Sequence, residues 1–328
     1  MDTHRAPSRI KLLVVTVNYR AADQIVERLG NVTQQLRALG DAALWIVDNK
    51  SPDDSLRVLT EAIAARGAAD VVRVIASPEN GGFGAGNNVA FREALALPDR
   101  PDYLYLLNPD AAPDPGAIER LVQFMDSHPQ VGIAGGAIRD PDSVLQASTF
   151  RFPSMFSEIE TSLQFGPVTR LLESRRVSMP TPREATFVDW VSGASMILRR
   201  EVLERAGLFD EGFFLYWEEV DLCRRARAAG FEISYVPDAA IVHVAGGTTG
   251  FHQPRSRVPR YWFESRAHFY RKTLGPWKLL ALNLVAASCV TLRRIREAVT
   301  GRAMERPHYL RDFIEFNFFG RRAGRDPL

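Results

Sequence analysis

The feature that most constrains this chain is the alternation of short apolar runs with helix-like segments over its first third. Four runs rich in β-branched, leucine or aromatic residues are typical of strands, and the first of them has the continuous apolar pattern of a strand buried on both faces. They cover residues 11–19, 43–47, 71–75 and 103–107. The intervening segments favour helices, and strands alternating with helices predict a mostly parallel sheet with right-handed crossovers. We therefore expect an α/β fold.

Polar residues follow each of these runs: Asn18, Asp48, the glycine-rich segment 80–88, and Asp110. Ligands of parallel sheets bind beyond the carboxyl ends of the strands, so we expect these residues to line one crevice. Segment 80–88, expected to be a turn that opens a helix, is not a dinucleotide fingerprint, because Gly86 has no glycine three positions later. It indicates either close approach of the backbone to a ligand or a plain tight turn.

The sequence Asn108-Pro109-Asp110 follows the fourth run directly. An acidic residue at a strand end suits a hard cation that also contacts substrate phosphates. The alternative is an aspartate that merely opens the turn at 110–115.

Three carboxylates lie within the apolar stretch 214–222: Glu218, Glu219 and Asp221. Unpaired carboxylates are costly to bury, so the cluster indicates a metal, a catalytic base or a buried arginine partner. The alternative is an ordinary helix start, in which Asp221 pairs with Arg224 or Arg225 and both glutamates are solvated. The helix is expected to end at Gly230.

The remainder of the first 250 residues predicts further strands at 131–136, 187–198, 231–236 and 240–244, and a short helix at 199–206. Residues 150–186 show no clear period, and we expect a loop or lid with some helix near 168–176. His243 lies alone in an apolar strand, where a core histidine is usual. The glycine-rich stretch 246–250 that follows favours a ligand or phosphate role as the alternative.

A net charge of +2 indicates no particular partner, and the two distant cysteines, Cys223 and Cys289, fit a reducing cytoplasm without a structural zinc site. The apolar run at residues 12–17 is too short for a signal peptide, and no stretch is expected to span a bilayer. Residues 277–292 fit either a buried helix or a helix lying on an anionic membrane surface.

Aromatic and basic residues interleave between Arg255 and Lys272. Such a patch could bind nucleic acid, but lipid diphosphate headgroups and a membrane surface are the favoured interpretation. A helix that packs on the rest of the chain is the alternative.

Taken together, the motifs resemble family 2 glycosyltransferases of the GT-A fold, especially the bacterial rhamnosyltransferase-like branch. They cover residues 10 to 250, and the matching segments are 15–19, 47–49, 80–88, 107–110, 192–194, 207–211, 217–222 and 240–243. The resemblance implies a Rossmann-like nucleotide-diphospho-sugar transferase fold, with a mixed, mostly parallel sheet flanked by helices. It implies a catalytic domain at 1–250 and a helical, membrane-associated extension at 251–328.

The resemblance also implies roles for individual residues. Glu219 is the catalytic base, with Glu218 beside it near the acceptor. Asp110 and His243 hold Mg²⁺ or Mn²⁺ against the donor diphosphate, although Asn108 replaces the first aspartate of the usual Asp-x-Asp motif. The nucleotide and donor residues are Thr16, Asn18, Tyr19, Asp48, Asn80, Gly84, Asn87, Asn108 and Asp110. The acceptor residues are Trp190, Gly193, Ala194 and Trp217.

The implied function is inverting sugar transfer from a nucleotide-sugar to a free or polyprenyl-diphosphate-linked saccharide in cell-surface polysaccharide synthesis. The expected donor is dTDP-L-rhamnose, and UDP-galactofuranose or a UDP-hexosamine would suit the same motifs. Because of Asn108, a non-catalytic nucleotide-sugar-binding protein is the competing hypothesis. The expected location is the cytoplasm, peripheral on the inner face of the membrane, without nucleic acid. A homo-oligomer is left open.

Overall fold

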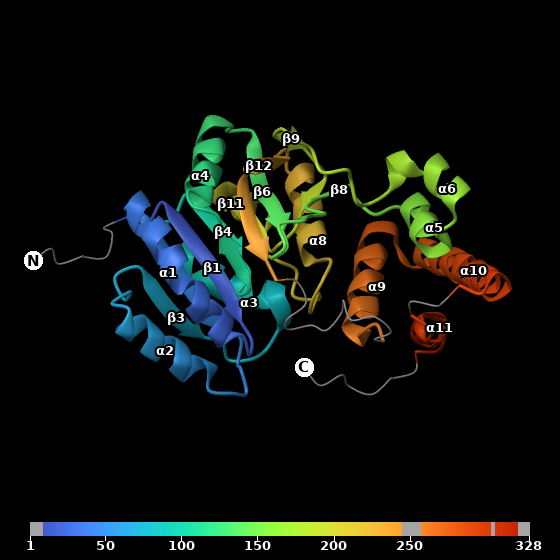
Figure 1. Ribbon diagram of the computed structural model, residues 1–328, viewed down its shortest axis with the longest axis horizontal. Coiled ribbons are helices and arrows are strands. Elements are labelled where there is room, and N and C mark those ends of the chain that lie inside the picture. Colours follow the sequence, from blue (N-terminus) through green and yellow to red (C-terminus); the bar gives the residue numbers. More distant parts are fainter. Residues whose placement is uncertain (1–8, 245–256, 303–305, 321–328) are drawn as a thin grey trace, which may run out of the picture.

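The computed structural model describes residues 9–244, 257–302 and 306–320. Within these residues ten strands form one mixed sheet, whose main path runs β3-β2-β1-β4-β11-β6-β12-β5 (Figure 1). Its strands are β1 (Leu12–Asn18), β2 (Ala42–Asp48), β3 (Val72–Ala76), β4 (Tyr103–Leu107), β5 (Ala111–Pro113), β6 (Val131–Arg139), β7 (Leu145–Gln146), β9 (Thr186–Phe187), β11 (Ser195–Arg199) and β12 (Glu232–His243). Two further strands, β8 (Thr149–Phe150) and β10 (Trp190–Val191), pair with each other.

The first four strands are parallel, as expected from the alternating pattern. Beyond them β11 runs antiparallel to both β4 and β6, while β12 is parallel to β6. The α/β class and the mixed sheet are thus confirmed, and the parallel pairing is concentrated in β1 to β4.

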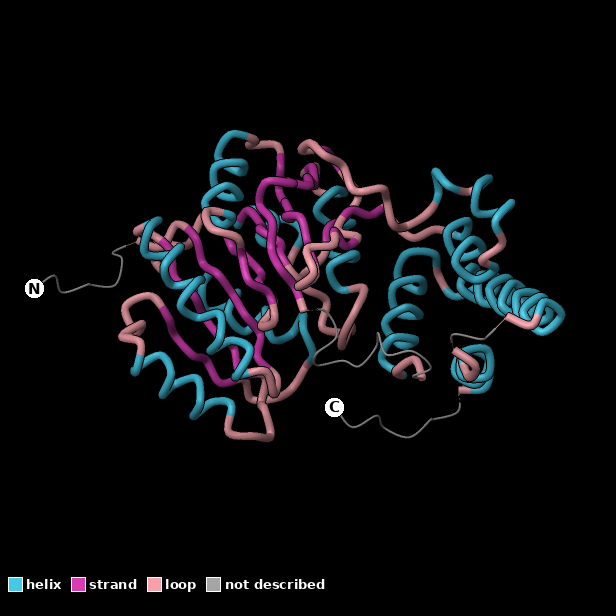
Figure 2. The backbone as a smooth tube through the Cα atoms, in the orientation of Figure 1, coloured by secondary structure: helices cyan, strands magenta, loops and turns pink. Residues whose placement is uncertain are grey.

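Helices cover both faces of the sheet, as the tube view shows (Figure 2). One face packs against α1 (Ala22–Leu39), α2 (Ser55–Ala65) and α4 (Ala117–Ser127), and the other against α3 (Gly82–Leu95), α7 (Arg200–Ala206) and α8 (Glu218–Ala228). Along β1, Leu12 and Val14 belong to the first core, and Leu13 and Val15 to the second. Side chains of a strand alternate between faces, so a strand covered on both sides reads as one continuous apolar run.

Two predicted strand patterns differ in the structure. Residues 187–198 are not one strand: β9, β10 and β11 are separate, and the small residues 192–194 between them leave the sheet. Conversely, the predicted turn at Pro237-Asp238 does not interrupt β12, which shifts register against β6 between Val236 and Ile241. Proline lacks an N–H donor, and a strand can accommodate it in such an irregularity.

The glycine-rich segment is the start of α3 rather than a turn before it. Gly82 has φ +87°, and a Cβ there would lie 1.7 Å from the backbone oxygen of Phe214. A Cβ on Gly86 would lie 2.7 Å from Cγ1 of Val17. The glycines therefore let α3 pack closely on β1 and on the backbone at Phe214. Glycines are also typical of turns, so the sequence pattern resembles a turn.

The C-terminal region is helical, as expected, with α9 (Arg260–Leu274), α10 (Pro276–Thr300) and α11 (Tyr309–Phe319). The expected lid at 150–186 contains α5 (Met155–Leu163), α6 (Gly166–Leu171) and the 3₁₀ turn η1 (Glu173–Arg175), and α5 packs on α10 (Figure 1). The predicted helix near 168–176 corresponds to α6 and η1, whereas α5 was not predicted. The boundary at 250/251, the glycines of 246–250 and Arg255 lie outside the described residues.

The aromatic residues of α9 are mostly internal, whereas its basic residues divide: Arg266 is buried, but Arg271 and Lys272 are exposed. Tyr261, Phe269 and Tyr270 are buried, and Arg266 is 1% exposed. These side chains pack α9 against the remainder of the molecule. No helix in the described ranges combines the length and apolar character that crossing a membrane requires.

Candidate functional site

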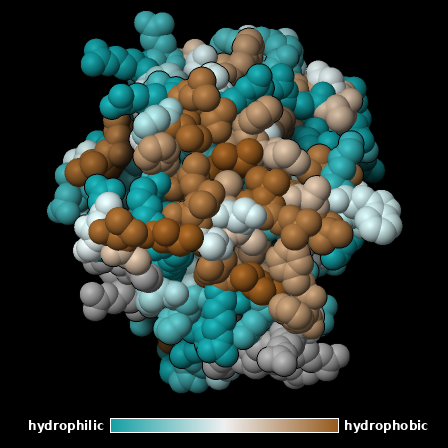
Figure 3. Space-filling model, turned by 90° about the vertical axis from the view of Figure 1, so that its right-hand side faces the viewer, coloured by the Kyte–Doolittle hydropathy of each residue, from teal (hydrophilic) through white to brown (hydrophobic). Residues whose placement is uncertain are grey.

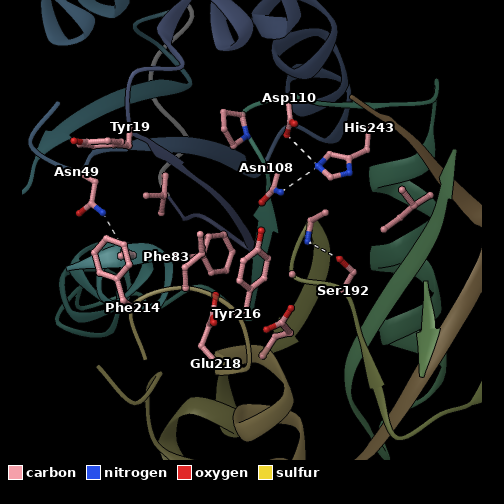
Figure 4. Close-up of a pocket in the computed structure, with 18 of the residues that line it drawn as sticks. Tyr19, Asn49, Phe83, Asn108, Asp110, Ser192, Phe214, Tyr216, Glu218 and His243 are labelled. Carbon is pink, nitrogen blue, oxygen red and sulfur yellow. Dashed lines mark hydrogen bonds and ion pairs between the residues drawn. The ribbon is translucent and has the colours of Figure 1, made fainter. Parts of the chain in front are cut away.

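A cleft of about 690 Å³ lies at the carboxyl ends of β1 and β4, where the sequence predicts a crevice (Figure 4). One end is bordered by Tyr19, Asn49 and Asn80, and the other by Asn108, Asp110 and His243. The 214–219 segment and the small residues 192–194 complete the wall. Residues separated by more than two hundred positions in the chain thus line one cavity.

Asp110 and His243 meet in the cleft. Nε2 of His243 lies 3.1 Å from Oδ1 of Asp110 and 3.2 Å from Nδ2 of Asn108. Backbone pairing between β5 and β12 aligns His243 with Ala111, and this brings the two segments together. The expectation that His243 is a plain core residue is therefore wrong: its side chain is 15% exposed and lines the cleft.

The residues present fit a divalent cation. Asp110 supplies a carboxylate and His243 an imidazole, and no group of three or more acidic, histidine or cysteine side chains suitable for a metal occurs in the described ranges. Mg²⁺ and Mn²⁺ sites of this type use one or two protein ligands and complete their shell with water and substrate phosphate oxygens. Asn108 does not add a carboxylate but holds its amide against the histidine.

Glu218 and Glu219 begin α8, directly after a strained backbone segment. Tyr216 and Trp217 have φ values of +66° and +74°, which are unusual for residues other than glycine. Such strain costs on the order of 1–3 kcal/mol per residue and is common at functional sites. Contacts with α9 hold the segment: the Trp217 ring lies 5.2 Å from Phe269, and Ser265 Oγ donates to the backbone oxygen of Leu215.

Glu218 is buried and Glu219 is only partly exposed, so the alternative interpretation of two solvated glutamates is wrong. Glu218 is 3% exposed, and in the described structure one carboxylate oxygen of each glutamate is buried without a hydrogen-bond partner. Asp221 has the predicted role instead: its carboxylate accepts from Arg225 Nε at 2.7 Å and from Lys272 at 2.9 Å.

Burial raises the pKa of Glu219 to about 7, while hydrogen bonds from the backbone of Gly193 and Val220 oppose the shift. Burial, followed by repulsion from Glu219, raises the pKa of Glu218 well above the usual range of a carboxyl group. Burial thus favours the neutral form of Glu218, whereas Glu219 is poised to exchange a proton near pH 7.

A second cavity of about 440 Å³ adjoins the first. Tyr216 and Glu219 line both cavities, and Trp190 and Trp217 line only the second. The indole of Trp190 stacks on Phe150 at 4.0 Å and donates to the backbone oxygen of Arg151. Glu219 therefore stands at the junction of two spaces, each large enough for a sugar.

The cleft brings together most of the residues expected to form the site. Those on its wall are Tyr19, Asn80, Asn108, Asp110, Gly193, Ala194, Glu218, Glu219 and His243. Five predicted donor residues do not line it and are buried: Thr16, Asn18, Asp48, Gly84 and Asn87.

These buried residues stabilise the segments that carry the wall of the cleft. The Asp48 carboxylate accepts from Asn18 Nδ2 at 2.6 Å and from the backbone N–H of Ser51. Asn87 donates to the backbone oxygen of Phe83, and Gly84 packs against Phe209. The side chain that reaches the cleft after β2 is Asn49, the neighbour of Asp48.

Sequence reasoning missed several wall residues, including Asn49, Phe83, Phe214 and Tyr216. Figure 4 shows Tyr216 among the site residues, and the side chain of Asn49 extends toward Phe214. The Asn49 amide donates to Asn80 Oδ1 at 2.9 Å and to the backbone oxygen of Gly82. Their signal was their position near recognised motifs: Asn49 and Phe83 lie within matched segments, Tyr216 adjoins one, and Phe214 lies between two of them.

Comparison with known proteins identifies the family. A sequence model described as glycosyltransferase like family 2 matches residues 7–266, well over half of the chain. The chain belongs to this family of glycosyltransferases. This confirms the family expected from the motifs, and it favours an enzyme over a non-catalytic binding protein.

Two curated relatives of this glycosyltransferase carry more specific names. The N-acetylglucosaminyl-diphospho-decaprenol L-rhamnosyltransferase of Mycobacterium tuberculosis is 28% identical over 275 residues, which are 81% of this chain and 86% of the relative. The rhamnosyltransferase WbbL of Escherichia coli is 28% identical over 166 residues, or 50% of this chain and 61% of that protein.

Solved structures confirm the fold of the glycosyltransferase. A mannosyltransferase of Pyrobaculum calidifontis, in complex with GDP-Man and Mn²⁺, superposes with a TM-score of 0.57 at 19% identity, covering 92% of this chain and 78% of that one. GalNAc-T7, solved with UDP, GalNAc and Mn²⁺, gives a TM-score of 0.58 at 14% identity over 94% of this chain and 57% of that one. At these identities the likeness shows the GT-A fold alone.

Proposed function

We propose that this glycosyltransferase transfers L-rhamnose from dTDP-L-rhamnose to a hydroxyl of a polyprenyl-diphosphate-linked saccharide, with inversion at the anomeric carbon. Two relatives are named rhamnosyltransferases, and one of these names specifies a diphospho-decaprenol-linked N-acetylglucosamine. The observation that carries the proposal is the convergence of Asp110, His243 and Glu219 on one cleft, with Glu219 also facing a second cavity.

In the proposed reaction, the nucleotide-sugar occupies the first cavity and the acceptor saccharide the second. The Glu219 carboxylate accepts the proton of the acceptor hydroxyl as its oxygen bonds to the anomeric carbon. The bond from that carbon to the diphosphate breaks on the opposite side, and dTDP leaves with the electron pair. A divalent cation held by Asp110 and His243 would offset the charge that accumulates on the diphosphate.

The protein residues also position the donor. Tyr19, Asn49 and Asn80 would border the nucleoside, and Phe83 with residues 192–194 would enclose the sugar. Gly193 and Ala194, which were expected to contact the acceptor, line the first cavity and not the second, so we assign them to the donor side. The expected contact of Asp48 with the base would be indirect, because its carboxylate is engaged by Asn18 and Ser51.

The test is a donor screen with the purified full chain and a polyprenyl-diphosphate-linked N-acetylglucosamine. Transfer from dTDP-L-rhamnose, and inverted configuration of the product by NMR, would support the proposal. Transfer from UDP-galactofuranose or a UDP-hexosamine alone would overturn the donor assignment. Donor binding without transfer to any saccharide would revive the binding-protein hypothesis.

The rate of transfer is expected to rise with pH. Only the ionised carboxylate of Glu219 can accept a proton, and its pKa is raised to about 7. We expect kcat/KM to increase roughly tenfold per pH unit below that value and to level off above it. The measurement is a pH series with dTDP-L-rhamnose; a profile that is flat from pH ~5.5 to 8.5 would exclude Glu219 as the base.

Removal of the Asp110 carboxylate is expected to uncouple nucleotide affinity from the metal. Mn²⁺ should tighten dTDP binding to the wild type by about tenfold or more, because a cation held by Asp110 and His243 would offset the charge of the diphosphate. The Asp110→Asn variant should bind dTDP equally with and without Mn²⁺ in isothermal titration calorimetry. An undiminished Mn²⁺ effect in this variant would place the metal elsewhere.

Peripheral membrane contact is proposed through the outer face of α10. Six large apolar side chains follow the helical spacing along this face, and each is at least 41% exposed. They are Trp277, Leu280, Leu284, Leu292, Ile295 and Val299. Figure 3 shows apolar side chains gathered on the molecular face that carries α10. The structure describes α10 completely, and its one acidic residue, Glu297, lines the second cavity instead. Such a face suits an anionic lipid surface.

Vesicle binding tests this face. The wild type is expected to co-sediment with phosphatidylglycerol-rich vesicles, and Trp277→Ser combined with Leu284→Ser should weaken binding about tenfold or more. Leu56→Ser is the matched control, since Leu56 is 42% exposed on α2. Equal loss in the control, or no binding by the wild type, would contradict membrane contact.

A further inference from the structure

Lys272, near the end of α9, joins two carboxylates that flank the proposed base along the chain. Its ammonium group donates to Asp210 Oδ2 at 2.8 Å and to Asp221 Oδ2 at 2.9 Å. Asp210 comes before the strained segment 216–217. Asp221 comes two residues after Glu219, on the first turn of α8. One side chain of the C-terminal helices therefore spans the whole segment that presents Glu219.

Asp221 is the buried end of this bridge. Its side chain is 0% exposed, and its carboxylate also accepts from Arg225 Nε at 2.7 Å. Arg225 in turn donates to the backbone oxygens of residues 206–208, at the end of α7. A carboxylate so far from water is costly to leave unpaired. Lys272 and Arg225 therefore fix Asp221, and with it the first turn of α8.

Asp210 is the second anchor of the bridge. Its carboxylate lies 3.0 Å from His268 Nε2 and accepts from the backbone N–H of Gly212 at 2.9 Å. Burial would raise the pKa of Asp210, but hydrogen bonds from Lys272 and His268 outweigh burial and hold that pKa well below its usual range. The carboxylate is therefore ionised at neutral pH and attracts the ammonium group of Lys272.

The opposite side of the same segment is fixed by α3. The buried Asn88 accepts from the backbone N–H of Phe209 at 3.0 Å and donates to the backbone oxygen of that residue at 2.9 Å. Further along, the backbone N–H of Phe83 donates to the backbone oxygen of Phe214 at 3.0 Å. The backbone of the segment is thus held from α3, whereas the charges that flank Glu219 are held from α9.

The cationic side of the bridge lies outside the part of the chain that identifies the family. The family model matches residues 7–266, and both His268 and Lys272 follow that range. Asp210, Asp221 and Glu219 all lie within it. In this chain the C-terminal helices therefore add a contact to the segment that carries the proposed base.

We propose that Lys272 is a positioning residue for glycosyl transfer: by joining Asp210 to Asp221, it keeps the carboxylate of Glu219 at the junction of the two cavities. This inference rests on the proposed function for the role of Glu219 as the base. Lys272 lines neither cavity, so it acts on Glu219 through the backbone of α8. A displacement of a reacting group by roughly 1 Å can lower a rate about 100-fold, so a small shift of this turn is measurable.

The variant Lys272→Met tests the role, because it keeps an unbranched side chain and removes the ammonium group. We expect kcat for transfer to fall about tenfold or more, with KM for the donor and dTDP affinity within about twofold of the wild type. Lys272→Arg should recover most of the activity, since a guanidinium group can also bridge two carboxylates. An unchanged kcat in Lys272→Met, even with a lower Tm, would overturn the proposal.

Arg271→Met is the matched control. Arg271 is the exposed neighbour of Lys272 on α9, and its side chain makes no hydrogen bond or ion pair with the part of the chain that the structure describes. The control removes the same charge from the same helix end, and we expect its kcat to equal that of the wild type. A loss of kcat shared equally by Arg271→Met and Lys272→Met would reflect net charge and overturn the positioning role.

A double-mutant cycle tests the bridge itself. Asp210 is 27% exposed, so Asp210→Asn spares the buried end of the bridge. In the Asp210→Asn background, Lys272→Met should lower kcat by a smaller factor than in the wild type, because one arm of the bridge is already broken. Fully multiplicative effects of the two substitutions would mean that Lys272 acts by another route and would contradict the assignment.

A crystal structure of Lys272→Met separates this inference from the proposed function, because it requires no turnover. We expect the carboxylate of Glu219 to be displaced by roughly 1 Å or more from its position in a crystal structure of the wild type. A displaced carboxylate in a protein that transfers no sugar would support the positioning role and refute the proposed function. An unmoved carboxylate in an enzyme that transfers rhamnose would do the reverse.

Discussion

Replacing Glu219 by glutamine is expected to lower kcat for sugar transfer by about 1,000-fold while leaving dTDP affinity within about twofold. Glutamine keeps the size of the side chain but cannot accept the proton of the acceptor hydroxyl. Glu219 is the carboxylate that lines both cavities, and its raised pKa makes it a stronger base than an exposed glutamate. The measurements are single-turnover transfer and calorimetric titration with dTDP.

Glu218→Gln is the matched control. Glu218 lines only the donor cleft, and burial raises its pKa well above the usual range, which favours the neutral form of the side chain. Glutamine resembles a protonated glutamate in shape and charge, so we expect kcat to change about tenfold or less. If Glu218→Gln were inactive and Glu219→Gln active, the two roles would be exchanged; if both were active, neither would be the base.

The arrangement of the parallel strands was predictable from the sequence because its physical cause is local. β1, β2 and β4 are covered on both faces and appear as uninterrupted apolar runs, while the edge strand β3 includes the exposed Arg73, and the residues after these strands meet at one edge. The convergence of Asp110 with His243 could be expected only through the family resemblance, since it depends on pairing between β5 and β12.

Features that depend on distant contacts were not predictable. The helical start at Gly82 requires the backbone of Phe214, more than 130 residues away, to lie against it. The left-handed backbone of Tyr216 and Trp217 has no signature in the sequence, because aromatic residues are disfavoured there and are held by the rings of α9. Helix α5 was missed for the same reason: the surface it packs on belongs to α10.

The second large effect is expected on stability. Replacing Arg266 by methionine should lower the free energy of unfolding by about 3–5 kcal/mol, the usual cost of removing one partner from a buried ion pair. The guanidinium is 1% exposed, donates to Glu158 at 2.8 Å and to Asn283 at 2.8 Å, and lies over the rings of Tyr270 and Phe313. One side chain therefore joins α9 to α5, α10 and α11.

Removing Arg266 would leave Glu158 with Tyr270 as its only other recorded partner, in a largely buried position that raises the cost of its charge. Arg266→Met combined with Glu158→Gln should recover part of the loss, because no uncompensated carboxylate remains. The control is Arg311→Met, which breaks an exposed pair whose arginine is 73% exposed and should cost less than about 1 kcal/mol.

Thermal unfolding followed by circular dichroism measures the three variants, and a loss of 3–5 kcal/mol corresponds to a Tm lower by roughly 6–15 °C. A Tm of Arg266→Met equal to that of Arg311→Met would show that the buried pair does not hold the C-terminal helices. Because Glu158 also lines the second cavity, the Arg266→Met variant should lose more affinity for the acceptor than for dTDP. The difference is expected because the first cleft is lined by residues at the ends of β1, β2 and β4, by the start of α3 and by the 214–219 segment, whereas the second cavity is lined largely by α5, α10 and the segment that precedes α11.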